Sequence, residues 1–93
     1  MKSPFVWDPA KAEANFAKHG VRFAEAEPVF EDDFAITIAD DISDPDEQRL
    51  VTIGTGAKDR VLVVVFCYRG DQIRIISART AEPQERIQYE EAR

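Results

Sequence analysis

The residues best suited to chemistry are a single histidine and a group of arginines. His19 lies at the predicted end of a helix, directly before Gly20. A protonated imidazole interacts favourably with the free carbonyl groups of a helix end, and histidine can donate a proton near neutral pH. His19 is therefore a candidate acid for protonating a leaving oxygen. The alternative is that it only caps the helix, which is the more frequent role of a lone histidine at such a position.

The arginines form the second group of candidates. They are Arg49 at the start of a predicted strand, Arg74 and Arg79 on either side of IISA, and Arg86 near the carboxyl end. A guanidinium binds phosphate through two parallel hydrogen bonds and keeps its charge, so it can stabilise a phosphoryl transition state without a metal. Residues five apart point to opposite faces of a regular strand, so we favour Arg79, at the strand's end, over Arg74. The alternative for Arg86 is a surface ion pair with Glu82, four residues earlier.

Other catalytic chemistries find no matching pattern. The aspartates between 40 and 46 lack the spacing of a calcium-binding loop, and one histidine with one cysteine cannot complete a zinc site. The stretch GTGAKDR lacks the spacing of a phosphate-binding loop and the helix that should follow it. No glycine-flanked turn surrounds Ser77 as a serine nucleophile requires. We therefore expect neither a metal nor a cofactor.

Length and composition predict one small domain spanning residues 1–93. No apolar run approaches the roughly 20 residues of a membrane helix, and the amino terminus lacks the layout of a secretory signal. Cys67 is the only cysteine and lies within VLVVVFCY, which indicates a buried thiol and excludes an internal disulfide. We expect a cytoplasmic protein.

The charge is distributed unevenly along the chain. The formal net charge is −6, which by itself argues against a nucleic-acid partner. However, the segment from Glu25 to Glu47, termed the acidic segment, contains ten acidic residues and no Lys or Arg. The rest of the chain has 12 basic and 8 acidic residues. The acidic segment either hides a basic remainder or merely keeps the protein in solution.

Two helices are predicted before the first long strand. Asp8 and Pro9 form a strong helix start and Gly20 a strong stop, with Lys11 and Lys18 on the polar face. A second, short helix is predicted over 23–30, although Pro28 is unfavourable within it.

Strands follow over 34–40, 49–54, 61–68 and 72–79, with a polar turn over DDISDPDEQ and a hairpin at RGD. Thr80 is the predicted cap of a final helix that runs to about Ala92 and carries only a thin apolar stripe. The order is a short strand, one or two helices, an antiparallel sheet of three to four main strands and a carboxyl-terminal helix. This segregation of helices from strands predicts an α+β fold.

Three stretches together carry a resemblance to a known family: FVWDPAKAEANFAKHGVRFAEA, EQRLVTIG and RIISARTAEPQERIQY. The chain resembles the BrnT family of toxins over nearly its whole length. The resemblance implies a RelE-like α+β fold, metal-independent cleavage of RNA and arrest of translation. It also implies a BrnA-type ribbon-helix-helix antitoxin that binds the toxin and forms a heterotetramer with it. In this complex, only the antitoxin contacts operator DNA.

The resemblance also assigns site residues. The family's Lys-His pair corresponds to Lys18 and His19, its first-helix lysine to Lys11, and its Glu-Arg pair to Gln48 and Arg49, where the glutamate lies one residue early at Glu47. The remaining signatures fall on Ser77 to Arg79, on Glu85 and Arg86, and on Tyr89. The expected roles are phosphate stabilisation for Arg79 and Arg49, proton transfer for His19 or Lys18, and RNA binding for Lys11, Arg86 and Tyr89, the last by stacking or positioning.

Two other functions remain open at this point. A non-catalytic binding partner and co-repressor of a DNA-binding antitoxin would keep the fold and the interface but tolerate changes at His19 or Arg79. A small metal-dependent nuclease would need a carboxylate cluster and divalent ions. If the chain is a toxin, the acidic segment could instead serve the antitoxin, because it would attract a basic strand or helix of that partner.

Overall fold

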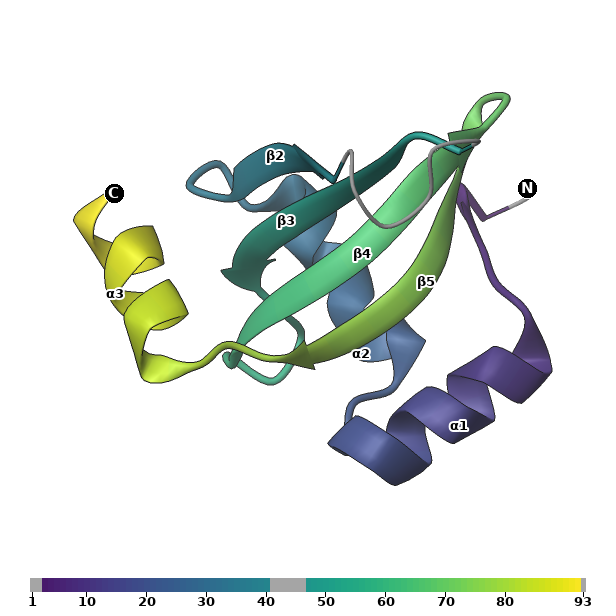
Figure 1. Cartoon of the computed structure of the whole chain (residues 1–93), viewed down its shortest axis with the longest axis horizontal. Coiled ribbons are helices and arrows are strands. Elements are labelled where there is room, and N and C mark those ends of the chain that lie inside the picture. The colour runs from purple at the N-terminus through teal and green to yellow at the C-terminus, as the bar shows by residue number, and fades with distance from the viewer. Residues whose placement is uncertain (1–2, 41–46, 93) are drawn as a thin grey trace.

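The protein is an α+β fold built on a five-stranded sheet of order β1-β5-β4-β3-β2 (Figure 1). The computed structural model describes residues 3–40 and 47–92. The strands are β1 (Phe5–Val6), β2 (Ile36–Asp40), β3 (Arg49–Thr55), β4 (Val61–Arg69) and β5 (Gln72–Thr80). The helices are α1 (Pro9–His19), α2 (Phe23–Ala26), the 3-10 helix η1 (Glu27–Glu31) and α3 (Pro83–Glu91). Most of the predicted polar turn, residues 41–46, lies outside the described part.

The sheet is mixed rather than purely antiparallel. Strands β2, β3, β4 and β5 pair antiparallel in order, as the sequence predicts for the main strands. The short β1 adds to the far side of β5 in parallel, with Phe5 beside Ile73 and Val6 beside Arg74. β2 begins two residues later than predicted, because Phe34 belongs to the preceding turn, where its amide donates to the Asp32 carboxylate.

Local sequence signals set the limits of α1. Asp8 accepts a hydrogen bond from the Ala10 amide at 2.8 Å, and Pro9 takes the first helical position. Gly20 ends the helix in the left-handed conformation, at a φ of 70°, and its amide donates to the Phe16 carbonyl. The predicted helix over 23–30 is divided into α2 and η1, where Pro28 enters the 3-10 turn that replaces a continuous α-helix.

The core lies between one face of the sheet and the segment of α2 and η1. Its buried members are Val21, Phe23, Ala26, Val29, Leu62, Val64, Ile75 and Ala78. In Figure 1, α2 lies behind the sheet and α1 runs beside the outer edge of β5, the strand that α1 contacts. Cys67 is buried, as predicted. Among the described residues, no helix has the length and apolar character to cross a membrane.

The carboxyl-terminal helix starts later than predicted. Thr80 is the last residue of β5, where it pairs with Leu62, so it does not cap α3. Glu82 is the cap, and a capping box joins it to Glu85: the Glu82 amide donates to the Glu85 carboxylate at 2.8 Å. Tyr89 is the one described residue of α3 that is buried, which agrees with the thin apolar stripe in the sequence.

Candidate functional site

One face of the sheet carries several arginines. Thr52, Val64 and Ala78 are buried in one row across β3, β4 and β5, on the side of the core. Their strand neighbours therefore point to the opposite side, because side chains alternate along a strand. We call this opposite side the open sheet face, because no described helix of the core covers it, although Val63 and Cys67 on it are buried by their neighbours. It is formed by Arg49, Val51, Ile53, Val63, Val65, Cys67, Arg74, Ser77 and Arg79.

A bulge in β5 places Arg74 on the open sheet face. Val65 pairs with Ser77 while the next residue, Phe66, pairs with Ile75, so Ile76 is an extra residue in β5. Arg74, which pairs with Cys67, consequently points to the same side as Ser77 and Arg79. Arg74 and Arg79 would occupy opposite faces of a regular strand, but this strand is not regular between them, so the reason for favouring Arg79 over Arg74 does not hold.

The basic residues of α1 meet β5 at a second feature, which we call the α1 groove. This cavity of about 250 Å³ is lined by Lys11, Ala14, Asn15, Lys18, His19, Ile76 and Ser77. Within the described residues, Lys11, Lys18 and His19 form no side-chain hydrogen bond or ion pair. The structure thus brings the three predicted residues of α1 together and leaves their polar atoms available to a ligand.

Arg79 lies near this groove but is bound within the fold. It follows Ser77 by two residues on the same face, a separation of about 7 Å along the strand. Its Nη1 and Nη2 atoms donate to the two oxygens of Glu85, both at 2.8 Å, and Nη1 also donates to the Thr80 carbonyl. The hydrogen bonds from Arg79 lower the pKa of Glu85, and the same contact raises the pKa of Arg79.

Arg49 lies at the other end of the open sheet face. It starts β3, whereas Arg79 lies in the row of Ile53, four residues further along, so the two arginines are about 13 Å apart along the strand direction alone. The Glu47 carboxylate is 3.5 Å from Arg49 Nε and 3.1 Å from Arg69 Nη2. The structure therefore does not place Arg49 and Arg79, the two arginines predicted to stabilise phosphate, around one phosphate. Instead, Arg69 and Arg74 lie near Arg49.

Tyr89 and Arg86 belong to a third feature, a cavity of about 730 Å³ between α3 and the ends of β3 and β4. The Tyr89 side chain is 3% exposed, so its ring presents almost no surface to a base. Its hydroxyl donates to the Asp32 carboxylate and accepts from Thr55. Arg86 lines the cavity together with Arg60 and, among the described contacts, forms no ion pair with Glu82.

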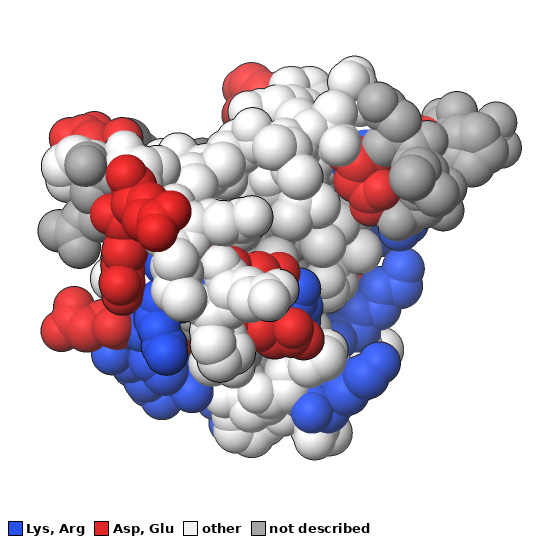
Figure 2. Space-filling view, turned by 60° about the vertical axis from the view of Figure 1, so that its left-hand side comes forward, with Lys and Arg blue, Asp and Glu red and all other residues white. Residues whose placement is uncertain are grey.

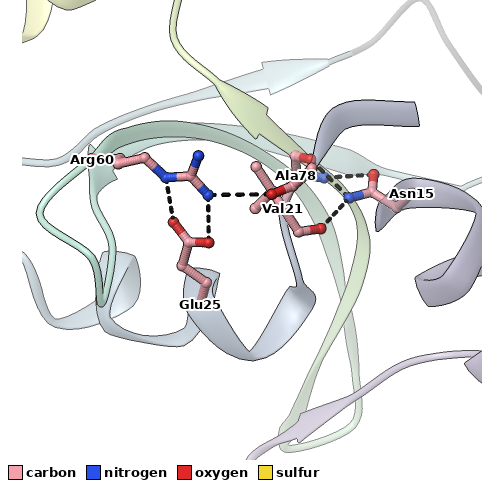
Figure 3. Close-up of polar contacts among 6 residues, drawn as sticks. Asn15, Val21, Glu25, Arg60 and Ala78 are labelled. Atoms are coloured by element: carbon pink, nitrogen blue, oxygen red, sulfur yellow. Dashed lines mark hydrogen bonds and ion pairs between the residues drawn. The ribbon is translucent and has the colours of Figure 1, made fainter. Parts of the chain in front are cut away.

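Three polar contacts that sequence reasoning missed hold these elements in place, and Figure 3 shows the two around Asn15 and Glu25. The Asn15 amide donates to the Val21 and Ala78 carbonyls at 2.9 and 2.8 Å and accepts from the Ala78 amide, which fixes α1 to β5. An asparagine in the middle of a helix is unfavourable by propensity, and this was the available signal.

The second missed contact is the ion pair between Glu25 and Arg60. The Glu25 side chain is only 4% exposed and accepts two hydrogen bonds from Arg60, at 2.6 and 2.8 Å. These bonds raise the pKa of Arg60, whose Nη2 also donates to the Gly20 carbonyl. The two residues are 35 apart in sequence, so no local pattern could have paired them. The third contact joins Asp32 to Tyr89 and Thr55. We call the Asp32–Tyr89 contact and the Arg79–Glu85 ion pair together the α3 attachment.

Basic side chains are unevenly distributed over the surface. Figure 2 shows Lys and Arg in the lower half of the face it presents, in separate groups at the left and right with uncharged surface between them and with Asp and Glu side chains close by. Among the described residues, no group of three His, Cys, Asp or Glu side chains could hold a metal ion.

Comparison with known proteins gives a consistent result. A family model described as "Ribonuclease toxin, BrnT, of type II toxin-antitoxin system" matches residues 7–85. The crystal structure of the Brucella abortus ribonuclease toxin BrnT superposes with a TM-score of 0.67 at 30% sequence identity, covering 84% of this chain and 95% of that one. A search of curated proteins found no match.

Proposed function

Because the chain belongs to the BrnT family of ribonuclease toxins of type II toxin-antitoxin systems, we propose that it is a cytoplasmic, metal-independent endoribonuclease that arrests translation. One observation carries the assignment of its site: Lys11, Lys18 and His19 line a groove that ends on β5, the strand that also carries Arg79. A cleavage site of this kind needs a proton donor and a fixed positive charge near one phosphate.

The mechanism follows from these groups. A base removes the proton of a ribose 2′-hydroxyl, the oxygen attacks the adjacent phosphorus, and the bond to the 5′-oxygen of the next nucleotide breaks. His19 or Lys18 serves in proton transfer as the base, and one of the two also serves as the acid that protonates the leaving 5′-oxygen. Lys11 binds a neighbouring phosphate, and Arg79 stabilises the negative charge that accumulates on the reacting phosphate.

Arg79 reaches the substrate with the part of its guanidinium that Glu85 does not occupy. Glu85 takes the edge formed by Nη1 and Nη2, which leaves the Nε edge for a phosphate. Glu85 thereby orients Arg79 as well as neutralising part of its charge. Arg49, with Arg69 and Arg74, offers the RNA backbone a second positive area further along the open sheet face.

The residues of α3 contribute less directly. Arg86 is exposed at the 730 Å³ cavity and can bind the RNA backbone there. Tyr89 acts as a positioning residue, because its buried hydroxyl attaches α3 to Asp32 and so supports the Glu85 side chain one helical turn before it.

Cleavage of purified RNA in excess chelator tests this proposal. Wild type should cut, while His19→Ala and Arg79→Ala should cut at least about 100-fold more slowly. Lys58→Ala, which removes an exposed lysine from the turn between β3 and β4, is the matched control and should cut normally. Cleavage that appears only with added divalent ions would contradict metal independence.

A specific observation supports a second candidate function. Arg79 and Tyr89, two residues that the family resemblance assigns to the site, already have partners inside the fold. A non-catalytic partner and co-repressor of the antitoxin would show this arrangement. It would not cut RNA in the assay above, with or without ribosomes, yet it would still bind the antitoxin.

The toxin's family implies a cognate antitoxin. We propose that this partner is a BrnA-type ribbon-helix-helix protein, that the complex is a heterotetramer, and that operator DNA is contacted only through the antitoxin. Measuring the mass of the purified complex tests the stoichiometry.

A further inference from the structure

The two edges of the sheet differ in how they are closed. At the β5 edge, β1 pairs with Ile73 and Arg74, and the Asn15 side chain binds both the amide and the carbonyl of Ala78. Asn15 thus takes the place that a neighbouring strand would occupy. At the other edge, β3 is the only described strand that pairs with β2, so the outer side of Ile36–Ala39 has no described strand beside it.

In the described part of the chain, the β2 edge has few of the features that usually prevent strand addition: it is short and ends in the charged Asp40, and it has none of the others. Natural proteins protect an open edge with proline, lysine, a bulge or a covering element. β2, with the sequence ITIAD, has no proline or lysine, and its pairing with β3 is regular over all five residues. Ile38, in the middle of the strand, is 61% exposed. An exposed apolar side chain on an open strand is a favourable contact for an added strand.

Charge determines what can add to this edge. The stretch 23–40 has six acidic residues and no Lys or Arg. Glu25 is neutralised by Arg60, but Glu31 at the end of η1 and Asp33 in the turn that leads into β2 are exposed. A second copy of this chain would bring the same acids together, and like charges disfavour that contact. A basic segment would be attracted instead.

We propose that the β2 edge accepts an extended, basic segment of the cognate antitoxin as an additional strand of the sheet, with an apolar side chain of that segment against Ile38. This inference rests on the proposed function, since it takes the antitoxin as the partner. Backbone hydrogen bonds would supply affinity, while Ile38 and the neighbouring acids would set the register and the charge preference.

Binding of the purified antitoxin from the same operon tests the inference. Ile38→Lys places on the strand a lysine of the kind that opposes strand addition, and it should weaken the affinity for the antitoxin at least about tenfold. Ile87→Lys, which makes the same change at a 51% exposed position on α3, is the control and should bind within about twofold of wild type. In wild type, hydrogen exchange of the amides of residues 36–40 should slow when the antitoxin binds.

Each other outcome is informative. Unchanged binding by Ile38→Lys, or unchanged exchange in β2, would overturn the proposal. A toxin that forms dimers by itself, and loses them in Ile38→Lys, would identify a second copy as the occupant. Failure of wild type to bind the antitoxin would also overturn it. RNA cleavage by free Ile38→Lys should equal that of wild type, so the ribonuclease proposal is judged separately by the chelator assay.

Discussion

The α1 groove and the attachment of α3 use similar polar residues in opposite ways. In the α1 groove, Lys11, Lys18 and His19 have no charged partner within the described residues. At the α3 attachment, Arg79 is held by Glu85 and Tyr89 by Asp32. A family motif therefore does not distinguish a ligand-binding side chain from one that holds an element in place. The distinction lies in whether an internal partner already uses the polar atoms.

This difference has a physical consequence for mutations. A side chain bound inside the fold contributes to folding stability, and its removal leaves a partner without its hydrogen bond. A solvent-facing lysine contributes little to stability but much to the binding of an anion. Substitutions at the α3 attachment should therefore change stability first, and substitutions in the α1 groove should change RNA binding or cleavage without changing stability.

The largest stability effect is expected at Asp32. Its carboxylate accepts hydrogen bonds from the Thr55 amide, the Phe34 amide and the Tyr89 hydroxyl. Asp32→Ala should lower the free energy of unfolding by about 3 kcal/mol, because several partners lose their acceptor together. Urea unfolding measures this change. Asp33→Ala, next in sequence and exposed, should change the free energy of unfolding by less than about 0.5 kcal/mol. An equal loss in both variants would show that the hydrogen bonds of Asp32 do not stabilise the fold.

A smaller effect is expected at Glu85, and it should depend on pH. The hydrogen bonds from Arg79 lower the pKa of Glu85 in the folded state below the ordinary value of a glutamate. The stabilisation is therefore complete above the unfolded value and is lost as the pH falls through the lowered folded value. Glu85→Gln should cost about 1 kcal/mol at pH 7, given the partial exposure of the pair.

Thermal unfolding of wild type and Glu85→Gln between pH 7 and pH 2.5 measures the dependence. The difference between the two proteins should shrink toward the acidic end, where Glu85 becomes protonated in wild type as well. Glu90→Gln, an exposed glutamate in the same helix, should show no such convergence. A constant difference across the range would mean that the ion pair does not stabilise the attachment.

The smallest effect is expected at Lys11. Lys11→Gln should leave the unfolding midpoint unchanged and weaken RNA binding several-fold at low salt, with the slope of log affinity against log salt reduced by about one phosphate contact. Fluorescence anisotropy with a short labelled RNA measures both. A lower unfolding midpoint in Lys11→Gln would show that the α1 groove also stabilises the fold. The α1 groove and the α3 attachment would then not differ in the way described above.

Much of the fold could be predicted from local patterns. Asp8, Pro9 and Gly20 delimit α1 as expected, and the hairpin of β4 and β5 turns at Gly70. These signals act over a few residues, so the sequence displays them directly. The cap of α3 was misplaced from Glu82 to Thr80, because Thr80 is a good cap by residue type while its pairing with Leu62 keeps it in β5.

The sequence offered candidate site residues, but their arrangement in space could not be predicted from it. The family resemblance named the residues, yet the bulge at Ile76 is what puts Arg74 and Arg79 on one face. The separation of Arg49 from Arg79 follows from strand register, which depends on pairing across the sheet.

The sequence by itself determined the family, the α+β class, the capped first helix and the buried thiol of Cys67, since each depends on short-range pattern or on the overall match. Only the tertiary structure decided which polar residues are used inside the fold. The partners of Asn15, Glu25 and Asp32 come from distant segments, and a hydrogen bond across such distances is created by packing. For the same reason, the closed β5 edge and the open β2 edge could not be told apart until the strands were placed side by side.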